Sequence, residues 1–291
     1  MPHARPAAVA GTFYPSTPAD LLQQIDALLG AADAPRGVPP KALIVPHAGY
    51  VYSGLTAARA YATLRGHGAA HGARDAPSIR RVVLLGPAHR VHLRGLALPD
   101  ADAFETPLGV VPLDREAAAR IPWVPRSAAA HRQEHSLEVQ LPFLIRALGA
   151  PGAPGFQLVP MAVGDASPEE VARVLEALWG GPETLIVISS DLSHYLPYTL
   201  ARSIDASTAQ AILDLVAEAA GPARPWITHE QACGATPING LLLVARRLGL
   251  APALLDLRTS GDTAGGRAEV VGYGAFAFRE ARGAAGVSDA D

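Results

Sequence analysis

Three histidines follow three short apolar runs of the chain. His47 comes two residues after the first run, His89 four residues after the second, and His194 follows the third within the segment SSDLSH. The runs are Ala42–Val45, Arg81–Leu85 and Leu185–Ile188. If they are strands of an open α/β sheet, their carboxyl ends meet where such sheets bind ligands. The pattern therefore predicts a cluster of imidazoles, which serve as metal ligands and as acid–base groups.

The single cysteine of the chain adds a thiol to this cluster. Cys233 stands in the segment ACGATP, directly ahead of a predicted helix that Thr236 and Pro237 open. A thiol near a helix N-terminus has its thiolate form favoured by the exposed amides, and the thiolate is the form that binds metal. We therefore expect two histidines and one thiolate to be available to a metal, with Asp191 and His194 nearby.

Each of these residues also has a purely structural explanation. His47 and His89 could be buried loop histidines bonded to backbone carbonyls, and Cys233 an inert core residue. Asp191 could cap a helix or turn, or form a local pair with His194. The sequence contains no CxxC or HExxH spacing, and none of His47, His89 and His194 belongs to an HxxxH pair, so the pattern alone does not decide between a metal site and these alternatives.

A second polar group precedes a leucine-rich segment. Glu134, His135 and Glu138 could support metal ligands through hydrogen bonds. They could equally form the solvated first turn of a helix, and from the sequence we favour the solvated interpretation.

Apolar runs alternate with helical patterns, which indicates an α/β fold with a mainly parallel or mixed central sheet flanked by helices. Helix starts are predicted at Thr17-Pro18 and Ser167-Pro168, each followed by an acidic residue of a capping box. Gly30 and Gly180 are the predicted helix ends. The other predicted helices are Ile238–Leu248 and about Ala206–Ala219, and the other predicted strands are Leu158–Val163, Ala253–Leu257 and Val270–Phe278, the last antiparallel or at an edge.

One helical pattern is interrupted by a proline. Leu137, Leu141, Leu144 and Leu148 share a helical face, but Pro142 falls among them, so the helix either starts late or is kinked there.

Composition limits the classes of protein that this chain can belong to. The 291 residues carry a formal net charge of −3 and are 49% apolar, which gives no indication of a nucleic-acid or membrane partner. One cysteine allows no intrachain disulfide, and no apolar run reaches the length of a spanning helix. We expect a cytoplasmic protein with one domain over residues 1–282 and a disordered tail over 283–291. The oligomeric state is unknown at this stage.

Six segments in order resemble the Memo family, whose bacterial and archaeal branch is also called AmmeMemoRadiSam system protein B. They are GTFYP at Gly11, PHAGY at Pro46, GPAH at Gly86, EHSLE at Glu134, SSDLSH at Ser189 and CG at Cys233. The likeness runs from about Ala10 to Phe278. The resemblance implies a fold similar to class III extradiol dioxygenases, which hold non-haem iron with two histidines and a carboxylate.

The resemblance also implies roles for individual residues. His47 and His89 match the histidine ligands, and Cys233 replaces the carboxylate. His194 matches the acid–base histidine of the dioxygenases, and Asp191 lines the same cleft. A thiolate is softer than a carboxylate and suits copper, zinc or thiolate-tolerant iron. The expected cofactor is therefore non-haem iron or copper, with zinc as a further choice.

Three functions are compatible with these residues. The first is a metal-dependent redox protein related to the dioxygenases, of unknown substrate. The second is a non-enzymatic module that uses the same cleft for a small anion or a (phospho)peptide, since members of the family in eukaryotes are linked to receptor phosphopeptides. The third is a zinc hydrolase, because two histidines, a cysteine and an open position suit catalytic zinc.

Overall fold

The computed structural model describes residues 3–33, 37–68, 78–215 and 226–280. The expected tail over 283–291 lies outside the described residues, as does the end of the helix expected over about Ala206–Ala219. None of the helices in the described part of the chain has the length and apolarity needed to span a bilayer.

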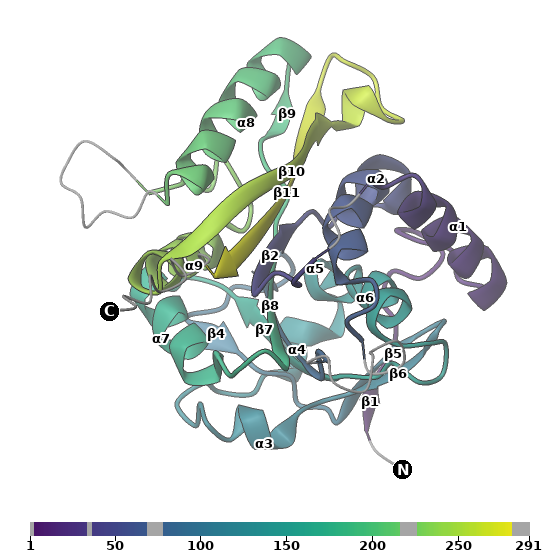
Figure 1. Cartoon of the computed structure of the whole chain (residues 1–291), viewed down its shortest axis with the longest axis vertical. Helices are drawn as coiled ribbons and strands as arrows, with labels where there is room; N and C mark the ends of the chain where they lie inside the picture. The colour runs from purple at the N-terminus through teal and green to yellow at the C-terminus, as the bar shows by residue number, and fades with distance from the viewer. Residues whose placement is uncertain (1–2, 34–36, 69–77, 216–225, 281–291) are drawn as a thin grey trace, which may run out of the picture.

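A mixed eight-stranded sheet forms the centre of the fold, in the order β10-β11-β2-β8-β3-β7-β4, with β9 paired to β11 beside this path (Figure 1). Strands β2, β8, β3 and β7 are parallel, and β4, β10 and β11 are antiparallel to their neighbours. The strands are β2 (Ala42–Val45), β3 (Arg81–Pro87), β4 (Leu96–Ala97), β7 (Gln157–Val163), β8 (Thr184–Ser189), β9 (His194–Leu196), β10 (Leu250–Thr259) and β11 (Val270–Glu280). The predicted α/β class and the antiparallel final strand are therefore confirmed.

Helices cover both faces of this sheet, so its parallel strands are apolar on both sides. Alternate residues of β2 point to opposite faces: Ile44 packs in one core with α7 and α9, and Leu43 packs in the other with α1, α2 and α6. The helices are α1 (Pro18–Gly30), α2 (Tyr50–Tyr61), α6 (Leu141–Leu148), α7 (Pro168–Leu178), α8 (Tyr198–Leu213) and α9 (Ala235–Arg247).

The predicted helix starts are present where the capping residues indicated them. The Thr17 hydroxyl accepts from the backbone N–H of Asp20, and Ser167 forms a complete capping box with Glu170. Pro142 does not kink a helix, because the segment divides into α5 (His135–Glu138) and α6, with Pro142 in the first turn of α6. The predicted start of α8 at about Ala206 was too late in the chain. This helix starts at Tyr198, directly after Pro197, and ends at Leu213.

A smaller layer closes one end of the sheet. It contains a three-stranded sheet of β1 (Ala4–Arg5), β5 (Ala103–Thr106) and β6 (Gly109–Pro112). The short helices α3 (Arg115–Ala118) and α4 (Ala128–Arg132) lie in the chain between this small sheet and β7. Two 3-10 turns lie elsewhere: η1 (Ala62–Leu64) follows α2, and η3 (Ser260–Asp262) lies between β10 and β11.

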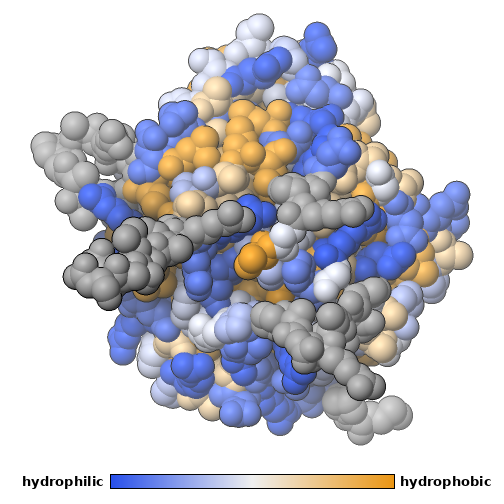
Figure 2. Space-filling model, viewed as in Figure 1, coloured by the Kyte–Doolittle hydropathy of each residue, from blue (hydrophilic) through white to orange (hydrophobic). Residues whose placement is uncertain are grey.

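The apolar strand β10 lies at the edge of the large sheet. Figure 2 shows apolar surface gathered around β10, where Leu254 is 40% exposed. Two features interrupt its edge: Pro252 has no N–H to donate, and Leu255 is left unpaired at a register shift against β11. Both features hinder pairing with a further strand, which an exposed apolar edge would otherwise invite.

Candidate metal centre

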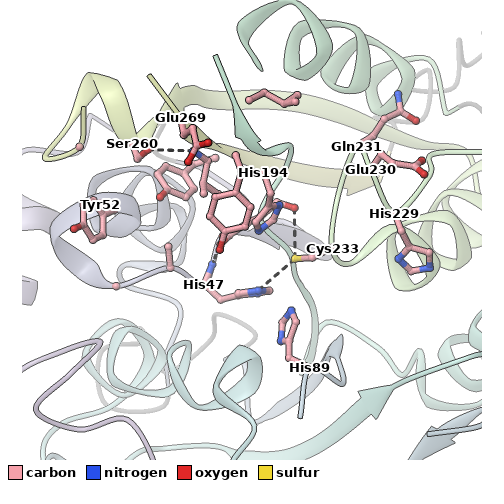
Figure 3. A pocket seen from close by; sticks show the side chains of 18 of the residues that line it. His47, Tyr52, His89, His194, His229, Glu230, Gln231, Cys233, Ser260 and Glu269 are labelled. Atoms are coloured by element: carbon pink, nitrogen blue, oxygen red, sulfur yellow. Dashed lines mark hydrogen bonds between the residues drawn. The ribbon is translucent and has the colours of Figure 1, made fainter. Parts of the chain in front are cut away.

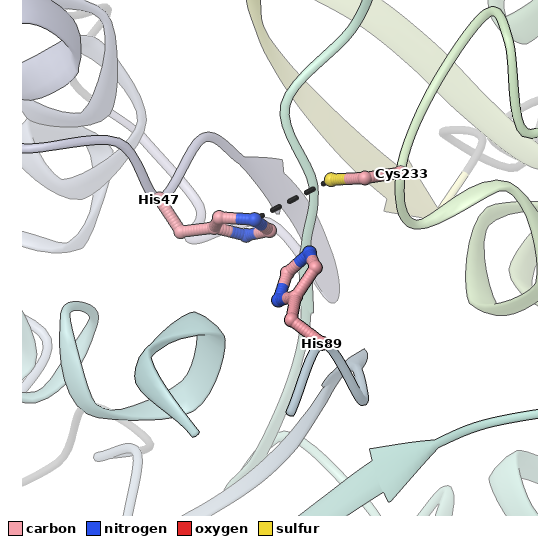
Figure 4. Close-up of side chains that lie close together, drawn as sticks. All are labelled: His47, His89 and Cys233. Atoms are coloured by element: carbon pink, nitrogen blue, oxygen red, sulfur yellow. Dashed lines mark hydrogen bonds between the residues drawn. The ribbon is translucent and has the colours of Figure 1, made fainter. Parts of the chain in front are cut away.

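Three side chains from distant parts of the chain converge at the carboxyl edge of the parallel strands (Figure 4). His47 follows β2, His89 follows β3, and Cys233 precedes α9. One ligand atom from each residue lies within 4.8 Å of the ligand atoms of the other two. The sulfur of Cys233 is 3.4 Å from Nε2 of His47. The structure thus brings together the three residues that the sequence analysis proposed as metal ligands.

A hydrogen-bond network fixes the tautomer of His47. The Ser189 hydroxyl donates its single proton to the backbone oxygen of Ser136, at 2.6 Å, and accepts from the amide of Gln140, at 2.8 Å. That amide is oriented by Tyr61, whose hydroxyl donates to Gln140 Oε1. Nδ1 of His47, 2.9 Å from the same hydroxyl oxygen, must therefore be the donor. A neutral imidazole protonated on Nδ1 presents the lone pair of Nε2, the form that binds metal.

Burial keeps the His47 ring in this neutral form. The ring is almost inaccessible to solvent, and burial lowers its pKa well below the usual value, with the neighbouring histidines His89, His135 and His194 adding to the effect.

A buried carboxylate fixes the tautomer of His89 in the same way. Glu134 is 1% exposed, and its Oε1 lies 2.9 Å from Nδ1 of His89. Burial raises the pKa of Glu134, but hydrogen bonds from His89 and Ser136 outweigh burial and hold that pKa at about 2. The carboxylate can only accept, so Nδ1 of His89 donates, and in the neutral ring Nε2 carries the lone pair. Carboxylates of this kind commonly orient metal-binding histidines. The solvated interpretation of Glu134 is therefore wrong.

The state of Cys233 differs from the prediction. Burial, and then the charge of Asp191, raise the pKa of its thiol to about 12, so the thiol is protonated in the metal-free protein. Gly234 forms the N-cap of α9, and its N–H donates to the Ser190 hydroxyl; the lowering effect of this N–H on the pKa of Cys233 is smaller than the rise caused by burial. The helix terminus thus does not produce the free thiolate that we expected. Deprotonation of this thiol requires a bound cation.

Asp191 and His194 occupy different positions around this cluster. Asp191 is 4% exposed, and its Oδ1 accepts the backbone N–H of His47 at 2.7 Å, so it holds the loop that carries the first ligand. Burial raises the pKa of Asp191, and the bond from His47 opposes the rise. His194 begins β9 and lines the cleft. No hydrogen bond joins these two side chains among the described residues, so the local pair that the sequence allowed is not formed.

His135 lies closer to the ligands than its sequence context suggested. Its ring stacks on that of His89, with centroids 4.7 Å apart and planes at 23°, and meets the ring of His47 edge-on at 5.5 Å. Burial lowers its pKa to about 4, with Glu134 opposing the effect, so the ring is neutral near pH 7. The side chain is only 14% exposed, so the solvated interpretation is wrong here too.

Glu138 belongs to the fold rather than to the cleft. It is fully buried, and its carboxylate binds Arg5 together with the N-terminal segment that carries Phe13, a cleft residue.

The geometry fits a metal with the bond lengths usual for these ligands. A metal bonded to nitrogen at about 2.0 Å and to sulfur at about 2.3 Å, at a tetrahedral angle, separates the two atoms by about 3.5 Å. The observed distance between His47 Nε2 and Cys233 Sγ is 3.4 Å. With the lone pair of His89 nearby, the donor set suits zinc, copper or iron.

The ligands lie at the base of a cleft of about 1260 Å³ that has two arms. Figure 3 shows Tyr52, Ser260 and Glu269 on one side of the cluster and His229, Glu230 and Gln231 on the other. The sequence analysis did not identify these two arms, nor the supporting group of Tyr61, Gln140 and Ser189. Ser189 opens the segment SSDLSH and was therefore within reach of the sequence argument. The other residues have no spacing or motif that distinguishes them.

Comparison with known proteins identifies the family of this chain. A family profile described as "Memo-like protein" matches residues 5–277. The chain belongs to the Memo-like family. A "MEMO1 family protein" of Aquifex aeolicus is 36% identical over 280 residues, covering 92% of this chain and 97% of the relative. A "MEMO1 family protein" of Methanosarcina barkeri is 34% identical, covering 94% and 98%, and one of Ignicoccus hospitalis is 35% identical, covering 94% and 98%. The resemblance to the Memo family that the sequence analysis described is thus confirmed.

Proposed function

We propose that this Memo-like protein is a metal-dependent redox protein whose His47, His89 and Cys233 hold one iron or copper ion. The observation that carries the proposal is the preset protonation of both histidines. Ser189 and Glu134 each accept from an Nδ1, so both Nε2 lone pairs are directed to the cleft beside the thiol. When bound, the ion would supply one-electron chemistry, as in the non-haem iron dioxygenases that the family resembles.

The residues around the ligands supply the remaining functions of this proposal. His194 lines the cleft from β9 and would exchange a proton with a bound substrate at its ring nitrogen. Asp191 would hold His47 in place through the backbone N–H, and His135 would cover the exposed face of His89. The single free thiol fits a reducing compartment such as the cytoplasm.

Elemental analysis of anaerobically purified protein tests the proposal. We expect near-stoichiometric iron or copper in the wild type and its loss in His47→Ala and in Cys233→Ala. His229→Ala, a cleft histidine outside the cluster, is the matched control and should keep its metal. Zinc in place of iron or copper would favour hydrolytic chemistry. A wild type that binds neither Fe(II) nor Cu(I) would overturn the redox proposal.

A second candidate function is metal-free binding of a small anion or a peptide. Two observations favour it: the volume of about 1260 Å³ exceeds what most small ligands fill, and the thiol of Cys233 is protonated at neutral pH. This candidate predicts ligand affinity that survives complete chelation of metal. Affinity that falls in step with metal content would contradict it.

A further inference from the structure

Tyr195 is held at the mouth of the cleft in an unfavourable backbone conformation. Its φ is 56°, a value that residues other than glycine adopt at a cost, and the residue is 72% exposed, so burial gives no compensation. The opposing strand β11 shifts its register between Val270 and Val271, facing this part of β9. Such irregularities often redirect a side chain beside a binding site. The conformation of Tyr195 therefore indicates a role in contacting a ligand.

Two further tyrosines line the same arm of the cleft. Tyr52 of α2 is 41% exposed, and Tyr273 of β11 is buried with its ring against the cleft. Burial raises the pKa of Tyr273, the charge of Asp191 adds to the rise, and Tyr52 and Tyr195 contribute further, so both phenol groups act on that of Tyr273. Three rings from three separate elements thus line this cleft.

The carboxylate of Glu269 lies on this arm without a cationic partner. It is exposed directly before β11, lines the cleft, and forms no ion pair with any side chain of the described residues. Arg267, two positions earlier, packs over the ring of Tyr198, with 4.4 Å between the guanidinium carbon and the ring centroid. Arg90, the one arginine lining the cleft within the described residues, is adjacent to His89 and so belongs to the metal end.

We propose that this tyrosine arm, formed by Tyr52, Tyr195, Tyr273 and Glu269, binds the ammonium group of a ligand whose other end lies at the metal ligands. Aromatic rings attract a weakly hydrated cation through their π faces, and a nearby carboxylate adds charge complementarity. The inference rests on the proposed function only for the far end of the ligand. The arm itself requires no metal, and it defines the substrate class as molecules that carry an alkyl- or quaternary ammonium group.

Choline and its uncharged isostere 3,3-dimethylbutan-1-ol are the probes, titrated calorimetrically into the full chain, both as purified and after chelation. We expect choline to bind about tenfold more tightly than the alcohol, with the preference kept after chelation. Equal affinities, or no binding of choline, would overturn the proposal. Metal content measured on the same samples reports separately on the proposed function.

The choline affinity of single-residue variants tests which side chains bind the cation. Glu269→Gln and Tyr195→Asn should each weaken choline about 3- to 10-fold and leave the alcohol unchanged. Asparagine tolerates the backbone conformation of Tyr195, and Tyr195→Gly provides a second variant in case folding suffers. Glu230→Gln, the rim carboxylate of the other arm, is the matched control and should bind choline as the wild type does. An equal loss in Glu230→Gln would show general electrostatic attraction and refute the assignment to this arm.

Discussion

The sulfur of Cys233 lies 3.4 Å from Nε2 of His47, although 186 positions separate the two residues in the chain. Nε2 carries a lone pair and the thiol carries a proton, so this contact is a weak S–H hydrogen bond in the absence of metal. A bound cation would take the place of that proton. The contact therefore holds the two proposed ligands close to the spacing that a metal requires.

Metal binding should release about one proton at neutral pH, because burial raises the pKa of Cys233 to about 12 while His47 is already neutral. The apparent affinity should then rise about tenfold per pH unit below the thiol pKa. Calorimetry in two buffers with different ionisation enthalpies measures the proton count. Cys233→Ala should abolish the release, and a release of zero in the wild type would contradict the assignment of this thiol as a ligand.

Glu134→Gln should weaken metal binding by about 10- to 100-fold, because the neutral amide is a poorer partner for Nδ1 of His89. Its NH₂ group would also face the backbone N–H of His89, which now donates to the carboxylate. Competition with a chromophoric chelator measures the affinity. Glu230→Gln removes a rim carboxylate of the same cleft and should have little effect. Similar losses in the two variants would point to net charge rather than orientation.

Ser189→Ala should weaken metal binding about tenfold and destabilise the fold by about 1–3 kcal/mol, since it leaves Nδ1 of His47 and one of the two amide hydrogens of Gln140 without an acceptor. Ser136→Ala removes a neighbouring buried hydroxyl that donates only to Pro87, so it is the matched control. We expect this control to lose stability without losing affinity for metal. Unchanged affinity in Ser189→Ala would exclude tautomer control by Ser189.

Arg5→Met should cost about 3–5 kcal/mol of unfolding free energy, because it leaves the fully buried carboxylate of Glu138 without its cation. The same carboxylate accepts from the backbone of Ala8 and Val9 and from the Tyr14 hydroxyl, so the N-terminal segment depends on it. Denaturant unfolding measures the loss. Arg146→Met breaks the exposed pair with Asp26 and should cost at most about 1 kcal/mol. Equal costs would contradict the importance of burial here.

Asp205→Asn should stabilise the protein at neutral pH. Burial raises the pKa of Asp205 to about 6, above its ordinary value, and its Oδ2 has no hydrogen-bond partner among the described residues. The folded state therefore binds this proton more strongly, and the contribution of Asp205 to stability should fall by about 2–3 kcal/mol as the pH rises from about 4 to 6. The buried histidines His47 and His135 act in the opposite direction, because their lowered pKa values make the folded state bind protons less strongly in this range. Urea unfolding of both proteins isolates Asp205: the stability of the variant relative to the wild type should rise by about 2–3 kcal/mol between about pH 4 and 6. A difference that does not grow with pH would contradict this prediction.

Local signals in the sequence were sufficient for most of the element types and for placing two of the three proposed ligands. Thr17 and Ser167 cap their helices by hydrogen bonds to residues three positions away. The sequence motif therefore specifies the cap directly, without help from distant parts of the chain. The apolar runs before His47 and His89 place both residues at one edge, because parallel strands share a direction. Cys233 was proposed from its position ahead of a predicted helix and from the family resemblance, because no spacing connects it to the histidines.

Only the tertiary structure decided the protonation of these ligands and the shape of the cleft. The pKa of Cys233 depends on burial and on Asp191, and neither effect can be read from the residues around the thiol. The sequence favoured a solvated position for Glu134. In the fold, its Oε1 lies 2.9 Å from Nδ1 of His89, which is 45 positions away in the chain. The sequence by itself thus determined which groups reach the sheet edge. Long-range packing determined their desolvation and their hydrogen-bond partners, and these set the chemistry that the groups can perform.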